Sequence, residues 1–215
     1  MTLDLFDDAY PDTDARMGEQ ACVLRGFACA EMPQLWAALQ GILLQAPLRH
    51  MRTPGGHSMS VAMTNCGALG WITDERGYRY SPLDPLSQAR WPDMPDVFLR
   101  LARSAAARAG FTDFQPDACL INRYASGAKM SLHQDKNERD RLAPIVSVSL
   151  GMPAVFLFGG HARADPAQRH PLFHGDVAVW GGVDRMRFHG VMPVKAAPHD
   201  LTGAYRFNLT FRRAD

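Results

Sequence analysis

The second half of this chain consists of short apolar runs separated by glycine or proline, and this texture restricts the folds that the sequence can adopt. From Gln115 onward the runs are rich in β-branched and aromatic residues, and they cover residues 118–124, 145–150, 154–158, 176–180, 188–192 and 205–212. Short runs of this composition, bounded by turn residues, are typical of β-strands. Their even spacing predicts a double-sheet jelly roll, also called a double-stranded β-helix.

The first half of the chain has a different periodicity. Residues 31–45 place apolar side chains at helical spacing, and residues 96–109 form an alanine-, arginine- and leucine-rich stretch that stops at Gly110. Both stretches predict amphipathic helices. The whole chain is therefore expected to form one α+β domain over residues 1–215. Residues 1–114 would supply the N-terminal helices and a lid, and residues 115–215 the jelly-roll core.

The segment between the two helices is long and aromatic. Residues 47–95 are rich in glycine, proline, serine and threonine, yet they also contain Trp71, Tyr78, Tyr80 and Trp91. Long irregular segments inside a compact domain are often functional lids. A β-hairpin region whose aromatic side chains simply pack on the body explains the same pattern equally well.

Composition and charge restrict location and partners. The chain is 47% hydrophobic and 21% charged, with no apolar run near the length of a membrane span, and its N-terminus is acidic where a secretory signal would be basic. We therefore expect a cytoplasmic, monomeric protein with no membrane partner. The four cysteines lack the spacing of a metal or disulfide motif, so we expect them to be reduced. A basic excess after residue 20 is compatible with a nucleic-acid partner, although an ordinary solvated surface explains it as well.

A possible metal motif lies in the middle of the chain. If His133-Gln-Asp135 is extended, both potential ligands project from one face, as two members of the 2-His-1-carboxylate set of iron(II) oxygenases would. Alone the triplet is weak evidence, because roughly 0.7 such triplets are expected by chance. A second triplet, His174-Gly175-Asp176, is explained by a glycine turn leading into a strand.

A more specific pattern lies at the C-terminal end. In an extended Arg206-Phe-Asn208-Leu-Thr210-Phe-Arg212, alternation puts the polar residues on one face and the apolar residues on the other. A string of this type has a chance expectation of roughly 0.03. An edge strand with its polar face in water is one reading. The other is that two arginines on an inward face bind an anion, such as a small dicarboxylate, through bidentate pairing.

Several long motifs resemble one family, the AlkB-type iron(II)- and 2-oxoglutarate-dependent dioxygenases. They include Leu3-Asp-Leu-Phe, Thr53-Pro-Gly-Gly, Ser60-Val-Ala-Met-Thr-Asn-Cys-Gly, Asp117-Ala-Cys-Leu-Ile-Asn-Arg-Tyr124, Leu132-His-Gln-Asp-Lys136 and Asn208-Leu-Thr-Phe-Arg212. The resemblance implies that His133, Asp135 and His189 bind iron(II). It also implies that Arg206 and Arg212 bind 2-oxoglutarate with help from Asn122, Tyr124 and Asn208, and that O2 is the third reactant.

The resemblance further implies oxidative demethylation of N-alkylated bases of the 1-methyladenine and 3-methylcytosine type. The partner would be single-stranded or flipped-out DNA, with RNA also possible, and formaldehyde, succinate and CO2 would be released. Residues near the base and the phosphates would be Thr53, Met63, Trp71, Tyr78, Lys136, Asn137 and Arg163. Asn137 departs from the family pattern, which has aspartate there. Two alternatives stay open: an oxygenase acting on protein, RNA or a small molecule, and a non-catalytic jelly roll that binds nucleic acid.

Overall fold

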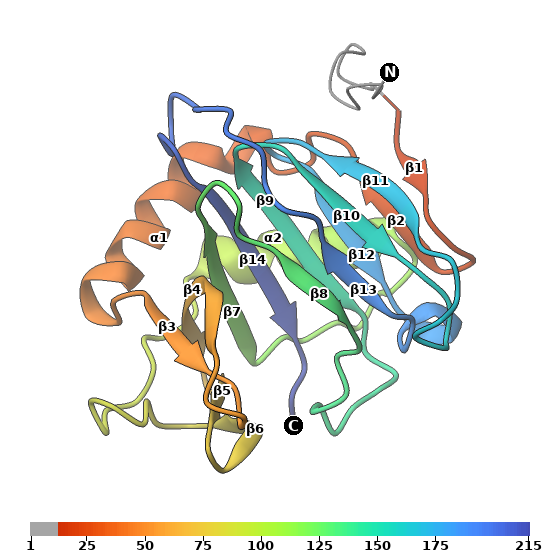
Figure 1. The fold of residues 1–215 in the computed structure, drawn as a ribbon. Coiled ribbons are helices and arrows are strands. Elements are labelled where there is room, and N and C mark those ends of the chain that lie inside the picture. Colours follow the sequence, from red (N-terminus) through yellow and green to blue (C-terminus); the bar gives the residue numbers. More distant parts are fainter. Residues whose placement is uncertain (1–12) are drawn as a thin grey trace.

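Two β-sheets face each other in the computed structural model, which describes residues 13–215 (Figure 1). The first motif, at residues 3–6, and most of the acidic N-terminal segment lie outside the described residues. The sheets are mainly antiparallel, and two helices cover the outer face of the larger one. This arrangement confirms the predicted α+β jelly roll.

The large sheet has the strand order β1-β2-β12-β9-β14-β7-β4-β3. Its strands are β1 (Ala15–Arg16), β2 (Ala21–Leu24), β3 (Arg49–Arg52), β4 (Ser58–Gly67), β7 (Ala118–Tyr124), β9 (Ile145–Gly151), β12 (Val177–Trp180) and β14 (Arg206–Arg212). β14 lies near the middle and pairs antiparallel with both β7 and β9. The strand with the arginine pattern is therefore held along both edges.

The small sheet has the order β11-β10-β13-β8 and a separate hairpin completes the set of strands. The small sheet consists of β8 (Met130–His133), β10 (Ala154–Phe158), β11 (Gln168–Leu172) and β13 (His189–Val191), and the hairpin of β5 (Gly70–Asp74) and β6 (Gly77–Ser81). In Figure 1 the hairpin lies at the same end of the molecule as the C-terminus.

The helices α1 (Met32–Gln45) and α2 (Asp96–Arg108) pack on the outer face of the large sheet, with two short 3-10 helices at Cys29–Glu31 and Gly182–Asp184. Leu35, Leu39 and Ile42 of α1 are buried in the same cluster as Phe98 and Leu101 of α2. The apolar face of β14 joins this cluster through Phe207, Leu209 and Phe211. Its opposite face, which carries the arginines, consequently turns inward between the sheets.

Most predicted elements exist within one or two residues of their expected ends. β1, β2, β8 and β11 were not predicted, and β11 contains Pro171, which sequence patterns usually exclude from a strand. The region between the helices is not irregular, since it contributes β3 and β4 to the large sheet and forms the hairpin β5–β6. Strands from before and after residue 114 therefore belong to the same large sheet, so the jelly-roll core is not confined to residues 115–215 as expected. Among residues 13–215, no helix combines the length and apolarity that crossing a bilayer requires.

Candidate active site

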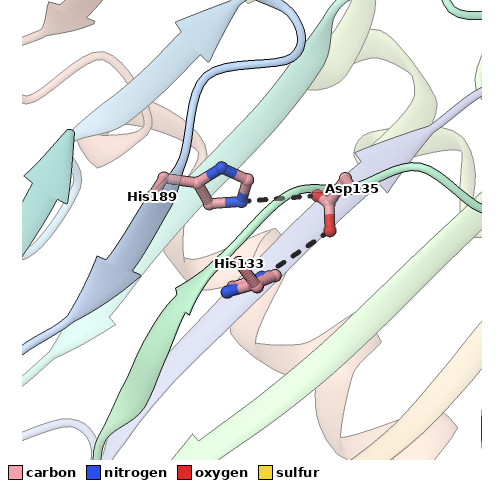
Figure 2. Close-up of side chains that lie close together, drawn as sticks. All are labelled: His133, Asp135 and His189. Carbon is pink, nitrogen blue, oxygen red and sulfur yellow. Dashed lines mark ion pairs between the residues drawn. The ribbon is translucent and has the colours of Figure 1, made fainter. Parts of the chain in front are cut away.

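Three side chains with metal-binding atoms converge between the sheets. His133 Nε2 lies 3.7 Å from Asp135 Oδ1, and His189 Nε2 lies 3.6 Å from Asp135 Oδ2. All three ligand atoms are within 4.8 Å of one another, and Figure 2 shows them facing a common space. Two imidazoles and one carboxylate on one side of a space match the facial set that binds iron(II) and leaves positions open for other ligands. The structure therefore brings together the predicted trio.

The strands of the small sheet hold the two histidines. His133 ends β8 and pairs directly with His189, the first residue of β13. Asp135 lies two residues beyond the end of β8, and its carboxylate faces both imidazoles. His133 Nδ1 lies 2.9 Å from the Ser131 carbonyl oxygen, and His189 Nδ1 lies 3.0 Å from that of Arg187. A carbonyl oxygen accepts a hydrogen bond from the Nδ1–H, which leaves each Nε2 with a lone pair for a metal.

The electrostatics of the trio also fit a cation. Burial, with a contribution from His189, lowers the pKa of His133 to about 4, so that its imidazole is neutral at physiological pH. Burial alone would raise the pKa of Asp135, but Arg212 and His189 hold that pKa well below its usual value. The neutral imidazole of His133 and the ionised carboxylate of Asp135 are in the protonation states that metal binding requires.

The inward face of β14 holds two buried arginines. Arg206 is 1% exposed and donates from Nη2 to Ser149 Oγ at 2.9 Å, while its Nε and Nη1 have no hydrogen-bond partner in the structure. Burial lowers the pKa of Arg206 to about 10, so it stays charged at neutral pH. A buried cation with two unsatisfied donors fits a carboxylate, which takes two parallel N–H bonds.

The second arginine, Arg212, contacts the carboxylate of the His133, Asp135 and His189 trio. Its Nε and Nη2 donate to Asp135 Oδ2 at 3.0 and 2.8 Å, and its Nη1 is buried without a partner. Asn122 Nδ2 donates to Asn208 Oδ1, and Asn122 Oδ1 has no partner. These residues line the same cavity as Tyr124, Arg206 and the side chains of His133, Asp135 and His189. The cavity therefore fits a metal ion together with a small dicarboxylate.

The hairpin β5–β6 carries aromatic rings, one of which contacts the segment that follows Asp135. Trp71 of β5 and Tyr78 of β6 are stacked, with centroids 5.7 Å apart and planes 23° apart. Asn65 of β4 fixes the backbone of Trp71, because its side-chain amide both donates to the Trp71 carbonyl and accepts from the Trp71 N–H, each at 3.0 Å. Trp71 Nε1 donates to Asn137 Oδ1 at 3.4 Å.

The other predicted substrate residues lie in different surroundings. Thr53 is half-buried at the β3–β4 turn and accepts a hydrogen bond from the His57 N–H. Lys136 and Arg163 are exposed, and the Arg163 guanidinium lies 5.2 Å from the Phe188 ring centroid. Met63 is fully buried, in the apolar cluster against which Trp71 packs. Met63 therefore belongs to the apolar cluster that supports Trp71 of the hairpin. Its expected contact with a base stays a prediction.

The competing triplet has a structural role. Asp176 is fully buried, accepts from the side chain of Arg25 at 2.6 Å, and also accepts from the Gly26 and Phe173 N–H groups. His174 Nδ1 accepts from the Gly151 N–H at 3.0 Å, and its ring stacks on His199. Gly175 has a φ of +85°, which favours glycine. The turn interpretation of this triplet agrees with the structure.

Sequence reasoning missed several residues that shape the site. Ser147 accepts from Asn208 Nδ2 at 2.7 Å, and Ser149 accepts from Arg206. Glu138 and Arg185 form a buried ion pair with a distance of 3.0 Å. The alternation of β9 could have indicated the serines, since Ser147 and Ser149 are two residues apart on one face. No comparable signal marks Glu138 or Arg185.

Comparison with known proteins agrees with this geometry. Residues 20–212 match the model of the 2OG-Fe(II) oxygenase superfamily. The chain belongs to this superfamily. It is 57% identical over 212 residues to the alpha-ketoglutarate-dependent dioxygenase AlkB of Escherichia coli, covering 99% of this chain and 98% of that protein. It is 30% identical over 131 residues to the human nucleic acid dioxygenase ALKBH1, covering 60% of this chain and 33% of that protein.

A solved structure gives the same assignment of fold. The structure of OsALKBH1 superimposes with a TM-score of 0.81 at 28% identity, covering 94% of this chain and 100% of that one. This member of the 2OG-Fe(II) oxygenase superfamily is thus an AlkB-type dioxygenase that uses iron(II), 2-oxoglutarate and O2. The cavity described above has the donors that these groups require.

One glycine beside the site permits the close approach of two strands. A Cβ at Gly190, between His189 and Val191, would lie 2.6 Å from the Met130 carbonyl oxygen and 3.2 Å from the Leu132 amide nitrogen of β8. Gly190→Ala is therefore expected to push β8 away from β13, which separates His133 from His189. We expect a loss of about 1–3 kcal/mol in the free energy of unfolding, and weaker metal binding measured by Co(II) titration.

The matched control is Gly41→Ala in α1, where an added Cβ meets nothing within 4 Å. This change is expected to stabilise the protein by up to about 1 kcal/mol, since alanine favours a helix over glycine. Its Co(II) affinity should equal that of the wild type. Equal Co(II) affinity in the Gly190→Ala protein would contradict the close-approach argument.

Proposed function

We propose that this protein removes N-linked methyl groups from bases such as 1-methyladenine and 3-methylcytosine in single-stranded DNA, with RNA as a second candidate substrate, as a direct reversal of alkylation damage. The observation that carries the proposal is the stacked pair Trp71 and Tyr78 on a hairpin that contacts Asn137, two residues past the Asp135 of the 2-His-1-carboxylate trio. An aromatic platform of this kind suits an unpaired base, because every base has a π-face for stacking. The human relative is named a nucleic acid dioxygenase, which also supports a nucleic-acid substrate.

The residues of the cavity would bind the metal ion and the co-substrate in two groups. His133, Asp135 and His189 would hold iron(II), while Arg206 and Arg212 would bind the carboxylates of 2-oxoglutarate with Asn122, Tyr124 and Asn208. Bound iron supplies the oxidising chemistry, which consumes 2-oxoglutarate and O2 and hydroxylates the N-methyl group. The hydroxymethylated base then releases formaldehyde, and the co-substrate leaves as succinate and CO2.

The chain's own groups mainly position the reactants and exclude water. A methyl group on the pairing edge of a base is out of reach inside a duplex, so the nucleotide must be single-stranded or flipped out. Trp71 and His133 would stack on the base, and Tyr78, Met63 and Thr53 would surround it. The exposed cations Lys136 and Arg163 would contact phosphates. The cytoplasmic location, the monomeric state and the single domain stay predictions.

A substrate panel tests this proposal. The wild-type protein is incubated with iron(II), 2-oxoglutarate and single-stranded DNA, single-stranded RNA, duplex DNA or a methylated peptide, each with matched N-methyl content. We expect the greatest formaldehyde release from single-stranded DNA with 1-methyladenine or 3-methylcytosine. Greater release from the peptide would favour the alternative oxygenase. Tight binding of the oligonucleotides without any turnover would favour the non-catalytic module.

Asn137 provides a sharper test of base recognition. Its Oδ1 accepts from Trp71 Nε1, and its Nδ2 donates to the Tyr78 carbonyl at 3.4 Å, so it lies at the edge of the aromatic platform. Asparagine adds no charge next to a base, whereas aspartate would favour a cationic ring. We therefore expect Asn137→Asp to increase the preference for 1-methyladenine over neutral 1-methylguanine by about fivefold in relative kcat/KM, or about 1 kcal/mol.

The measurement is a competition between the two lesions in otherwise identical single strands. It is run for the wild type and for Asn137→Asp at the same ionic strength. The exposure of Asn137 limits the electrostatic effect, which should also fall as salt is raised. An identical ratio for the two proteins would show that Asn137 does not face the base.

A further inference from the structure

A buried cluster of charged residues lies directly behind the metal-binding carboxylate. Arg185 Nη2 donates to Glu138 Oε2 at 3.0 Å, and its Nη1 donates to the Asp135 carbonyl at 2.8 Å. Arg212 binds Asp135 Oδ2 and approaches Glu138 Oε1 with its Nε at 3.5 Å. The side chains of Arg185 and Glu138 are each 2% exposed, and those of Arg212 and Asp135 are 7% and 10% exposed. Two cations and two anions thus neutralise one another away from water.

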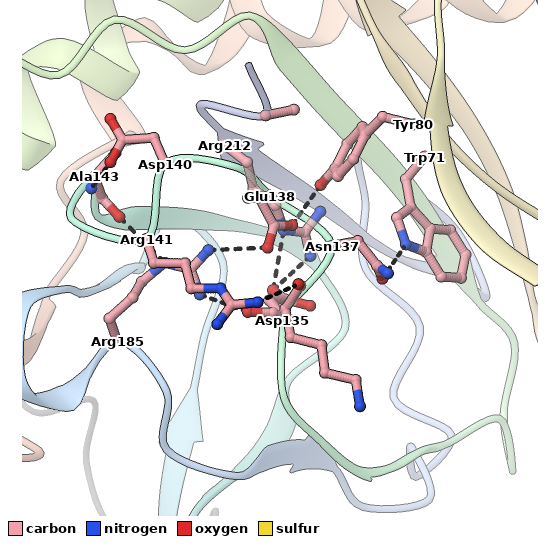
Figure 3. Close-up of polar contacts among 12 residues, drawn as sticks. Trp71, Tyr80, Asp135, Asn137, Glu138, Asp140, Arg141, Ala143, Arg185 and Arg212 are labelled. Atoms are coloured by element: carbon pink, nitrogen blue, oxygen red, sulfur yellow. Dashed lines mark hydrogen bonds and ion pairs between the residues drawn. The ribbon is translucent and has the colours of Figure 1, made fainter.

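The hairpin β5–β6 is connected to this cluster by one hydroxyl. Tyr80 of β6 donates from its hydroxyl to Glu138 Oε1 at 2.6 Å. Figure 3 shows Tyr80 reaching from the hairpin towards Glu138 and Arg212, with the contact of Trp71 to Asn137 beside it. Residues 135–138 therefore carry the metal-binding carboxylate at one end and two contacts to the hairpin at the other.

Glu138 is placed to orient Arg212. Asp135 would also bind a metal ion, and Arg212 would also donate to a carboxylate of the co-substrate. The hydrogen bonds between Asp135 and Arg212 alone therefore do not fix the direction of the Arg212 guanidinium. Glu138 does not have to bind a metal ion or a co-substrate as well, because its two oxygens already accept hydrogen bonds from Tyr80 and Arg185. A fully buried carboxylate next to a guanidinium restricts the directions in which that guanidinium can point.

We propose that Glu138 is a positioning residue that couples the hairpin β5–β6, through the Tyr80 hydroxyl, to Arg212 and thus to the affinity for 2-oxoglutarate. The proposal rests on the proposed function, in which the hairpin covers a base. A base under the hairpin holds Tyr80 in place, Tyr80 holds Glu138, and Glu138 keeps Arg212 aimed at the co-substrate. Coupling of this kind is reciprocal, so 2-oxoglutarate tightens nucleic-acid binding by the same factor.

The test measures the dissociation constant of 2-oxoglutarate on the Mn(II)-loaded protein, with and without a saturating single-stranded oligonucleotide that contains one 1-methyladenine. Mn(II) replaces iron so that no turnover occurs. For the wild type we expect the oligonucleotide to tighten 2-oxoglutarate binding by about fivefold or more. Tyr80→Phe removes one oxygen and should reduce this ratio to near one. The affinity without oligonucleotide should stay within about twofold of the wild type, because Phe keeps the packing of the ring.

Two further variants separate coupling from simple structural support. Tyr205→Phe is the matched control, since this half-exposed ring contacts Arg123 far from Glu138, and it should keep the wild-type ratio. Glu138→Gln should also lower the ratio. The double variant Tyr80→Phe/Glu138→Gln should lower it no further, because both substitutions act on the same contact between Tyr80 and Glu138. Additive losses, an unchanged ratio in Tyr80→Phe, or a wild-type ratio of one would overturn the proposal.

The thermal unfolding midpoint of each variant distinguishes coupling from a purely structural role. A purely structural role would lower the midpoint and leave the ratio of the two dissociation constants unchanged. Formaldehyde release by the iron-loaded wild type on the same oligonucleotide is measured separately. Absence of that release contradicts the proposed function, whereas release with an unchanged ratio in Tyr80→Phe contradicts the coupling alone.

Discussion

The His189→Ala variant is expected to lose iron-dependent turnover, although His189 looks like an ordinary core histidine in the sequence. Its Nε2 lies 3.6 Å from Asp135 Oδ2, and its ring packs against Trp180 and Phe156, so its position is fixed before any metal binds. Two remaining ligands cannot hold iron(II) in facial geometry against water. The same loss is expected for His133→Ala and Asp135→Ala. Succinate formation at saturating iron(II) and 2-oxoglutarate is the measurement.

The control for this prediction is His174→Ala. His174 belongs to the competing triplet, and its side chain contacts the Gly151 backbone and the His199 ring. The variant should lose some stability and keep most of its activity. A folded but inactive His174→Ala protein, together with an active His189→Ala protein, would mean that the wrong triplet has been assigned to the metal.

Replacing Arg206 by lysine is expected to weaken 2-oxoglutarate binding by about 1.5–3 kcal/mol, or roughly tenfold to more than a hundredfold. The guanidinium is buried, keeps one bond to Ser149, and has two donors without a partner in the structure. The ammonium group of lysine cannot reproduce the planar arrangement of N–H donors in a guanidinium. The apparent KM for 2-oxoglutarate should rise, and kcat should partly recover at high co-substrate concentration.

Arg213→Lys is the matched control for Arg206. Arg213 follows the same strand, but its side chain is 47% exposed and pairs with Asp140 at 3.7 Å. Its replacement should leave the KM for 2-oxoglutarate unchanged. If Arg206→Lys also leaves this KM unchanged, the co-substrate carboxylate binds elsewhere in the cavity.

The parts of the site that lie on regular strands could be predicted from the sequence. The alternation from Arg206 to Arg212 predicts which side chains turn inward. The structure confirms this, because the apolar members of β14 pack in the large cluster and its polar members line the cavity. Strand residues have only two faces, so a two-residue period is enough to assign them. His189 could not be assigned in this way. Its role depends on β13 lying next to β8, and pairing between strands that are distant in sequence leaves no local signal.

The residues that support the ligands were not predictable from local patterns. Glu138 and Arg185 are 47 residues apart, and they meet only after both sheets have formed. Asn65 supports Trp71 through two bonds that depend on the course of the hairpin relative to β4. Charged and amide residues are usually exposed, and sequence periodicity cannot identify the few that are buried and paired.

The hairpin illustrates a choice that the sequence left open. Its aromatic residues were equally consistent with a lid and with a hairpin that packs on the body. The structure shows features of both, because Trp71 packs on an apolar cluster, while Tyr78 is 47% exposed and stacked upon it. The exposed face of this pair is what supports its proposed contact with a base.

Oxidative demethylation by this protein is tested by the product stoichiometry of the wild type on a single-stranded oligonucleotide with one 1-methyladenine. Metal-free protein is supplied with iron(II) and 2-oxoglutarate together, with each alone, or with neither, and formaldehyde and succinate are quantified in the same samples. We predict that both products appear only when both components are present, with one formaldehyde for each succinate while substrate remains. Formaldehyde release without iron(II), or succinate formation that never yields formaldehyde from any methylated oligonucleotide, would contradict the account.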